Sequence, residues 1–283
     1  MRSKSLLFRA ALNLYCSIVF AFLMLPLVIV FPLSVSSATY LQFPPPGYSW
    51  RWFESYFGSL SWMQATVLSI EVGCITSAFA VLLGVPLAFY LTRARWRIVS
   101  SVVEKLSISP LIIPSIVTAI VVYRLFASYR LIGTMPALVL GHTILALPFV
   151  VVVVSAALRT FDTTQEDAAM GLGAGRFRAV FFITLPQLRP SILAGAFFAF
   201  MASFDDLILA LYLSGSNMTL PRKTFENIQF AIDPTIAAVS VLQILFVVAL
   251  GGAWYVFARS ALRAASVTFP TVSSMNSINP KVS

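Results

Sequence analysis

Long runs of apolar residues, separated by short polar segments, follow one another along the chain. A helix of about 20 residues spans the hydrocarbon core of a bilayer, which is about 30 Å thick. Six runs reach that length, and we predict transmembrane helices over residues 12–33, 65–91, 106–127, 136–158, 191–213 and 235–258. The runs are continuous, whereas strands of a membrane barrel alternate apolar and polar residues. The pattern therefore predicts an all-α integral membrane protein with six transmembrane helices.

The segments between the predicted spans are short. The longest cover residues 34–64 and 159–190, and chains below about 40 residues rarely fold as independent domains. We therefore predict one transmembrane domain over residues 1–263. The remaining residues, 264–283, are rich in Ser and weakly apolar, and this composition predicts a disordered tail.

The composition excludes a water-soluble globular protein. Of the 283 residues, 59% are hydrophobic and 10% are charged, whereas soluble domains carry about 25% charged residues. The net charge of +9 at pH 7 raises the alternative of a nucleic-acid-binding protein. The basic residues lie in separate segments between the spans and not on one face. We therefore expect contact with membrane lipid and not with nucleic acid.

The basic residues also orient the chain, because cytoplasmic loops of membrane proteins are enriched in Lys and Arg. With the N-terminus inside, most of the 19 Lys and Arg fall in the inner segments. The outer side receives only Arg51, Arg124, Arg130, Arg222 and Lys223. We predict that both termini and the 159–190 loop are cytoplasmic.

No motif of a membrane enzyme is present. His142 is the single histidine, which excludes an HExxH zinc site, and a lone intramembrane histidine usually makes a hydrogen bond between helices. The sequence contains neither a GxSxG turn nor a GxxxxGK[ST] loop for ATP phosphates. Cys16 and Cys74 fall in separate predicted spans without metal spacing. We predict no catalytic residue, no metal site and no cofactor in this chain.

The longer cytoplasmic loop carries the most local information. Thr163, followed three residues later by Glu166, is typical of a capping box that starts a helix. The glycine-rich residues 171–175 are predicted to end this helix in a tight turn. A second short helix over residues 176–183 is expected to end before Pro186. The product is a helix, a turn and a helix, with small residues that another protein can approach closely.

At these residues the sequence resembles the permease subunits of bacterial binding-protein-dependent ABC importers. Their cytoplasmic signature reads Glu-Ala-Ala, three residues, Gly, nine residues, Ile, one residue, Leu-Pro. Aspartate stands here where the family usually has glutamate, with Glu166 directly before it. The residues that match the spacing are Asp167, Ala168, Ala169, Gly173, Ile183, Leu185 and Pro186. The resemblance implies a coupling helix that sits in a cleft of an ATPase subunit. The alternative is a solvated loop that only connects two spans.

The resemblance extends over nearly the whole chain, since six spans with this loop between the fourth and fifth are similar to the smaller permease of a type I importer. It implies the type I ABC importer permease fold and a place in the bacterial inner membrane. It also implies a second permease subunit in a heterodimer, two ATPase subunits that bind ATP and Mg²⁺, and a periplasmic solute-binding protein. The outer loops, including residues 34–64, would receive the binding protein.

Acidic residues within the spans indicate the substrate, because an ionisable group near the bilayer centre costs about 2.5–3.5 kcal/mol on insertion scales. Glu71 lies in the second predicted span, and Asp205 and Asp206 lie in the fifth. At 1.5 Å per residue, Glu71 and Asp206 both lie about 9–10 Å below the outer surface, and Asp205 is adjacent to Asp206. They predict a path for a cation. The alternative is that they form structural ion pairs, for which Arg124 is the obvious partner.

The fifth span and the segment after it resemble the spermidine and putrescine branch of the permease family. The residues that carry this resemblance are Ser203-Phe204-Asp205-Asp206, Ser214-Gly215, Leu220-Pro221 and Asp233-Pro234-Thr235-Ile236. The resemblance implies polyamine import, and carboxylates beside the ring faces of Phe204 and Tyr212 suit an alkyl polycation. Importers of another small solute (an amino-alkyl compound, iron, a sugar or an anion) remain alternatives. Two further alternatives are a secondary transporter and a membrane enzyme. A secondary transporter should show paired broken spans in an inverted repeat.

Overall fold

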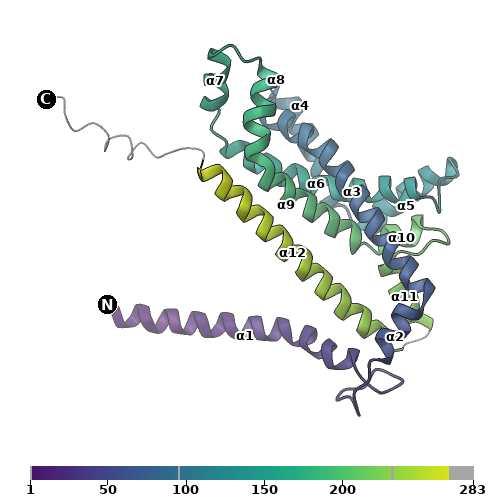
Figure 1. Cartoon of the computed structure of the whole chain (residues 1–283). Helices are drawn as coiled ribbons and strands as arrows, with labels where there is room; N and C mark the ends of the chain where they lie inside the picture. Colours follow the sequence, from purple (N-terminus) through teal and green to yellow (C-terminus); the bar gives the residue numbers. More distant parts are fainter. Residues whose placement is uncertain (1, 95, 231–232, 268–283) are drawn as a thin grey trace. The chain divides into compact units, whose positions relative to one another are not determined.

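The structure is a computed structural model that describes residues 2–94, 96–230 and 233–267, and these residues form helices without any strand (Figure 1). The all-α prediction is confirmed. The helices are α1 (Arg2–Ser34), α2 (Arg51–Gly58), α3 (Leu60–Arg93), α4 (Arg97–Ile112), α5 (Ser115–Ser128), α6 (Met135–Thr160), α7 (Thr164–Gly171), α8 (Arg176–Ala179), the π-helix η1 (Val180–Thr184), α9 (Leu185–Phe204), α10 (Ile208–Leu213), α11 (Leu220–Phe230) and α12 (Thr235–Val267).

Within the described residues, five helices are long and apolar enough to cross a membrane, and the bent pair α4 and α5 makes a sixth span. The count thus matches the six predicted spans when the bent pair is one of them. The segment expected as an outer loop over residues 34–64 contains α2 and the beginning of α3. The tail predicted from residue 264 is helical as far as Val267, and its remainder lies outside the described residues.

The third predicted span is not a straight helix. Helices α4 and α5 meet at an angle of 105°. Pro114 has no backbone N–H and disfavours helical geometry in the residue before it. Ile113 accordingly has the extended angles φ −74° and ψ 131°. The prediction of one continuous helix over residues 106–127 is therefore wrong at this point.

The fifth predicted span is also interrupted. Helix α9 ends at Phe204 and α10 begins at Ile208. In the break between them, Asp206 Oδ2 accepts a hydrogen bond of 2.7 Å from the backbone N–H of Leu209. A carboxylate that accepts from a first-turn N–H stabilises a helix N-terminus. The acidic pair predicted to lie on a continuous helix thus lies at a helix break.

The chain forms two compact units. One contains the residues up to Thr66 together with Arg222–Val248, and the other contains Val67–Pro221 and the chain from Ala249. Within the first unit, the Tyr56 hydroxyl lies 2.6 Å from Thr66 Oγ1. This hydrogen bond fastens α2 to the beginning of α3.

The core of the second unit places α6 along α9 (Figure 1). A Cβ atom added to Gly195 would lie 3.1 Å from Val150 Cα, so these helix backbones approach closely. A second apolar cluster joins α3, α5, α6 and α10 through Val72, Ala119, Val122, Phe126, Ala137, Leu138, Leu209 and Leu213. This cluster holds the helix break that carries the acids.

Candidate functional site

Helix α7 begins at Thr164, where the sequence predicted a helix start, but the cap is different. Thr163 makes no side-chain cap hydrogen bond. Asp162 Oδ1 instead accepts the backbone N–H of Thr164 at 3.0 Å and its hydroxyl at 2.7 Å. Glu166 is turned away from the helix start, so the predicted capping box does not form. The cap comes from the residue one position earlier.

The glycine-rich turn after α7 confirms the predicted helix stop. The Ala174 N–H donates to Ala169 O at 3.0 Å, and the Gly173 N–H donates to Met170 O at 3.0 Å. Gly173 has φ +91°. This pair of hydrogen bonds around a left-handed residue is the Schellman motif. It reverses the chain so that α8 lies beside α7 (Figure 1).

The second helix of the loop continues further than predicted. Helix α8 runs through η1 into α9, and the whole stretch Arg176–Phe204 is apolar enough to be one span. The prediction that this helix ends before Pro186 is wrong. Pro186 lies in the first turn of α9, where the π-helical turn before it tolerates a residue without an N–H. Ile183 and Leu185 are half-buried at the same junction.

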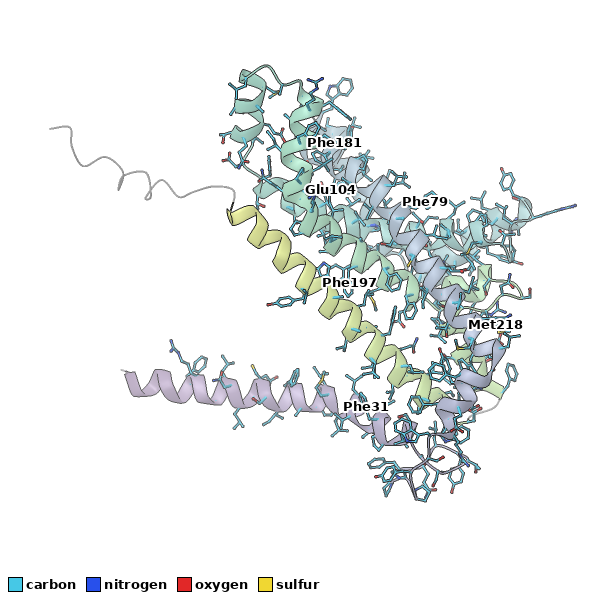
Figure 2. All side chains as sticks on the ribbon, in the orientation of Figure 1. Phe31, Phe79, Glu104, Phe181, Phe197 and Met218 are labelled. Atoms are coloured by element: carbon cyan, nitrogen blue, oxygen red, sulfur yellow. The ribbon has the colours of Figure 1, made fainter. Side chains whose placement is uncertain are left out.

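The signature residues of α7 and its turn face solvent. Asp167, Ala168 and Gly173 are exposed, and Ala169 is half-buried. Two apolar side chains that the sequence did not single out join this surface, since Leu172 is 91% and Phe177 is 83% exposed. Stacked on Phe177 is Phe181, labelled in Figure 2. Exposed apolar side chains of this kind mark surfaces where another protein binds.

Glu166 has the opposite environment from Asp167. Its carboxylate is buried and accepts two hydrogen bonds from the Arg93 guanidinium, at 2.6 and 2.8 Å. The Thr184 hydroxyl donates a third. Burial alone would raise the pKa of the Glu166 carboxyl, but the hydrogen bonds from Arg93 and Thr184 outweigh it and hold that pKa below its ordinary value. Glu166 therefore connects α7 to the ends of α3 and η1.

The carboxylate of Asp206 accepts a hydrogen bond from the Leu209 N–H and faces His142. His142 Nε2 lies 3.8 Å from Asp206 Oδ2, which is too long for a hydrogen bond. His142 is only 1% exposed, and its Nδ1 lies 2.7 Å from Leu138 O. When Nδ1–H donates to that carbonyl, Nε2 carries a hydrogen toward the carboxylate only in the doubly protonated ring.

The expected partner Arg124 does not take part. Arg124 is exposed, and the ion pairs within the described part of the chain do not include it. The sequence did contain a signal for His142. It lies six residues after the start of the predicted fourth span, and that spacing corresponds to about 9 Å of helix. The same depth was predicted for the acids.

The other predicted pathway residues differ in accessibility. Asp205 and Glu71 are exposed, and Val72 packs in the same cluster as α10, which brings Glu71 to the level of the break. Phe204 is 4% exposed and stacks on Phe200 with ring centroids 5.5 Å apart. Tyr212 is half-buried with its ring edge-on to Tyr123. Phe204 is therefore a packing residue, whereas Asp205 and Glu71 are open to a ligand.

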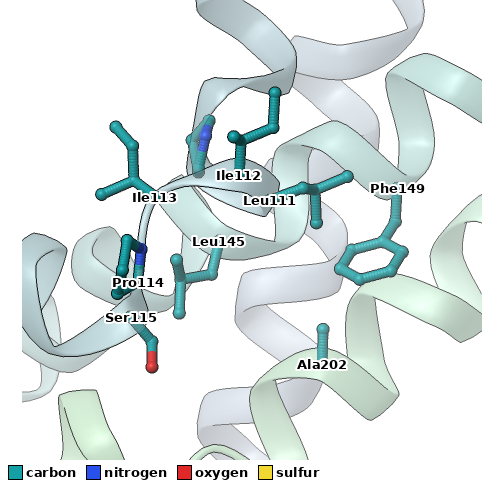
Figure 3. Close-up of a pocket in the computed structure, with 9 residues that line it drawn as sticks. Leu111, Ile112, Ile113, Pro114, Ser115, Leu145, Phe149 and Ala202 are labelled. Atoms are coloured by element: carbon teal, nitrogen blue, oxygen red, sulfur yellow. The ribbon is translucent and has the colours of Figure 1, made fainter.

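A pocket of about 440 Å³ lies at the bend between α4 and α5 (Figure 3). Leu145 lies one helical turn after His142 on α6, and Ala202 lies one turn before Asp205 on α9. Both offsets are about 4.5 Å along the helix axis. The pocket therefore lies within about one helical turn of His142 on one helix and of Asp205 on the other. Its lining is mainly apolar and consists of Pro110, Leu111, Ile112, Ile113, Pro114, Ser115, Leu145, Phe149 and Ala202.

Residues 80–264 match the family described as binding-protein-dependent transport system inner membrane component. The chain is 32% identical over 251 residues to the putrescine transport system permease protein PotI of Escherichia coli K12, covering 85% of this chain and 88% of that protein. It is 28% identical over 239 residues to the spermidine/putrescine transport system permease protein PotC of Haemophilus influenzae, covering 84% and 92%. Its fold is similar to that of a bacterial ABC transporter involved in alginate import, with a TM-score of 0.68, 13% identity and coverage of 88% and 96%.

Proposed function

We propose a function from one premise: the chain belongs to the family of binding-protein-dependent transport system inner membrane components, whose model covers residues 80–264. The chain is a multi-pass membrane protein with the fold of a type I ABC importer permease. It is the permease subunit of an ATP-driven importer and not an enzyme. It works with ATPase and binding-protein partners.

The substrate class that we propose is a polyamine such as putrescine or spermidine. One observation carries this choice. An adjacent acidic pair, Asp205 and Asp206, lies at a helix break within a span of a chain that is 32% identical to PotI. Acids at membrane depth are costly and are placed where they serve a pathway. Broken helices are a common way to present polar groups to a substrate inside a membrane.

The two acids have different tasks in this proposal. Asp206 is occupied by the Leu209 N–H and faces His142, so it fixes the break. The exposed Asp205 presents its carboxylate to an ammonium group, and Glu71 offers a second carboxylate at the same level. The apolar pocket beside the break receives the methylene chain. A diamine has both parts, charged ends and an apolar middle.

The cytoplasmic loop is proposed as the contact with the ATPase. Its exposed surface contains Asp167, Ala168, Gly173 and the apolar side chains Leu172 and Phe177. We propose that two ATPase subunits bind ATP and Mg²⁺, that a second permease completes the pore as a heterodimer, and that a periplasmic protein delivers substrate to the outer loops. The excess of basic residues in the inner segments supports cytoplasmic termini.

The test is uptake by the complete importer in proteoliposomes, with labelled putrescine and spermidine. Asp205→Asn should reduce polyamine uptake by about tenfold or more, because it removes the charge from the exposed acid. Asp206→Asn should have a smaller effect, since asparagine still accepts from the Leu209 N–H. Glu104→Gln, at an exposed acid on the cytoplasmic side, is the matched control.

Unchanged polyamine uptake by Asp205→Asn would exclude this acid from the pathway. The substrate class would be overturned if the wild-type importer took up a neutral or anionic solute and took up neither putrescine nor spermidine. The permease assignment would stand in that case, because uptake of the other solute would still depend on ATP.

A further inference from the structure

The buried ion pair between Arg93 and Glu166 joins elements that are distant in the sequence. Arg93 is the last residue of α3, Glu166 lies in the first turn of α7, and Thr184 ends η1. The side chains of Arg93 and Glu166 are 21% and 7% exposed. Arg176 contributes a further favourable charge near the carboxylate. One carboxylate thus connects the inner end of a span, the proposed coupling helix and the start of the next span.

The neighbouring acids Glu166 and Asp167 on α7 differ in exposure: the first is buried against the spans and the second faces solvent. Successive helix positions point about 100° apart, and this rotation separates the buried Glu166 from the exposed Asp167. A residue whose carboxylate is enclosed by Arg93 and Thr184 has no free face for an ATPase. The neighbouring aspartate has one. The sequence places both acids in the same motif, and only the structure separates them.

The rest of the loop is loosely held. Gly171, Gly173 and Gly175 have nothing packed around the position of an added Cβ. A hydrogen bond of 2.7 Å from Gln187 to Gln165 also links α9 and α7, but both side chains are exposed to water. Exposed polar contacts add little, whereas a buried bidentate pair fixes geometry. The Arg93–Glu166 pair is therefore the firm connection between α7 and the spans.

We propose that Glu166 is a positioning residue that fastens the coupling helix to the end of α3, so that a displacement of α7 by the ATPase reaches α3 directly. This inference rests on the proposed function as an ATP-driven permease. Without the ion pair, α7 would still meet the ATPase through Asp167 but would swing on its glycine turn. ATP hydrolysis would then continue with less movement of the spans.

The experiment compares variants of the complete importer in proteoliposomes and measures substrate uptake, ATP hydrolysis and co-purification of the ATPase. Glu166→Gln should leave co-purification intact and lower the substrate moved per ATP by roughly tenfold, within the usual range of coupling between sites. Exchange of the charges, Arg93→Glu with Glu166→Arg, should restore part of the loss. Asp167→Asn should instead weaken co-purification of the ATPase.

The matched control is the exposed ion pair between Arg159 and Glu104, which has the same residue types at 2.8 Å. Glu104→Gln should change neither the substrate moved per ATP nor the co-purification of the ATPase, since exposed ion pairs contribute little. Glu166→Asp, which keeps the charge and shortens the reach, provides an intermediate if Glu166→Gln does not accumulate in the membrane.

Three outcomes would overturn the proposal. They are an unchanged ratio of substrate to ATP in Glu166→Gln, a loss of ATPase binding equal to that of Asp167→Asn, or no recovery in the exchanged pair. Failure of the proposed function looks different, because the wild-type assembly itself would then show no ATP-driven uptake.

Discussion

Adjacent side chains of the same type have separate physical tasks in two places in this protein. At Glu166 and Asp167 the first acid is enclosed and the second faces solvent, and at Asp206 and Asp205 the arrangement is similar. The sequence placed all four in candidate sites but could not assign their tasks. The missing information was the identity of the long-range partners, Arg93 and His142. No pattern in the sequence specifies Arg93, and only the depth of His142 in its predicted span points to that partner.

The pH dependence of stability gives a prediction for Glu166. Its pKa is lowered in the folded protein, so its contribution is complete above the ordinary glutamate pKa of about 4.3 and is lost as the pH falls through the lower folded value. At pH 7, Glu166→Gln should lower the unfolding temperature in detergent, because removing one partner of a buried pair costs about 3 kcal/mol. The difference from the wild type should shrink below about pH 4.

Thermal unfolding of the two proteins across this pH range measures the effect. A difference in unfolding temperature that stays constant down to pH values well below about 4 would contradict the assignment. Glu104→Gln, in which the lost pair is exposed, should show little difference at any of these pH values.

At the scale of helices, the apolar pattern predicted where the spans lie but not where they bend or break. A run of apolar residues indicates the length of a span and its apolar surroundings, but it does not indicate whether the helix axis changes direction within the span. Pro114 was visible in the sequence, yet the 105° angle depends on what α4 and α5 pack against. The break after Phe204 was not predicted, although Asp205 and Asp206 lie in it, because the apolar run of the span continues on both sides of the acidic pair. Local turn chemistry was more informative, since the glycines correctly predicted the end of α7.

The turn after α7 offers a matched pair of substitutions. Gly173 has φ +91°, and Gly171 lies within the helix, while both have open space around an added Cβ. Gly173→Ala should cost about 1–2 kcal/mol through the left-handed backbone, whereas Gly171→Ala should stabilise α7 by up to about 1 kcal/mol. Hydrogen exchange of the α7 amides should therefore speed up in the first variant and slow down in the second.

Transport should respond in the same order. Gly173→Ala should lower uptake by the assembled importer while the protein still inserts, and Gly171→Ala should leave uptake close to that of the wild type. Equal exchange rates in the two variants would show that the Gly173 backbone is not left-handed in the membrane.

At the scale of the whole molecule, the low proportion of charged residues decided the class of protein, and the distribution of those residues predicted its orientation. Many large apolar side chains remain exposed, among them Phe22, Leu82, Ile112 and Val121. They suit a lipid environment, and they explain why a chain with this composition needs no larger core of its own. The sequence could predict this class, since it depends on totals and not on individual contacts.

Orientation is tested by cysteine labelling. In a background with Cys16→Ser and Cys74→Ser, a cysteine at Ser216 should react with an impermeant maleimide added to intact cells, because both residues that flank it, Gly215 and Asn217, are exposed in a predicted outer segment. A cysteine at Gly175 should react only after the membrane is opened. The reverse pattern would place the termini outside.

The π-helical turn over Val180–Thr184 has a consequence for insertions and deletions. A π-turn holds one residue more than an α-turn of the same height, so η1 can lose one residue without turning α8 relative to α9. Deletion of a single residue there would convert the turn to α-helix and leave Phe177 on the exposed surface. The same deletion within the α-helical part of α9 would instead rotate the residues before it by about 100°. The length of η1 can therefore change by one residue without changing the direction in which α8 faces.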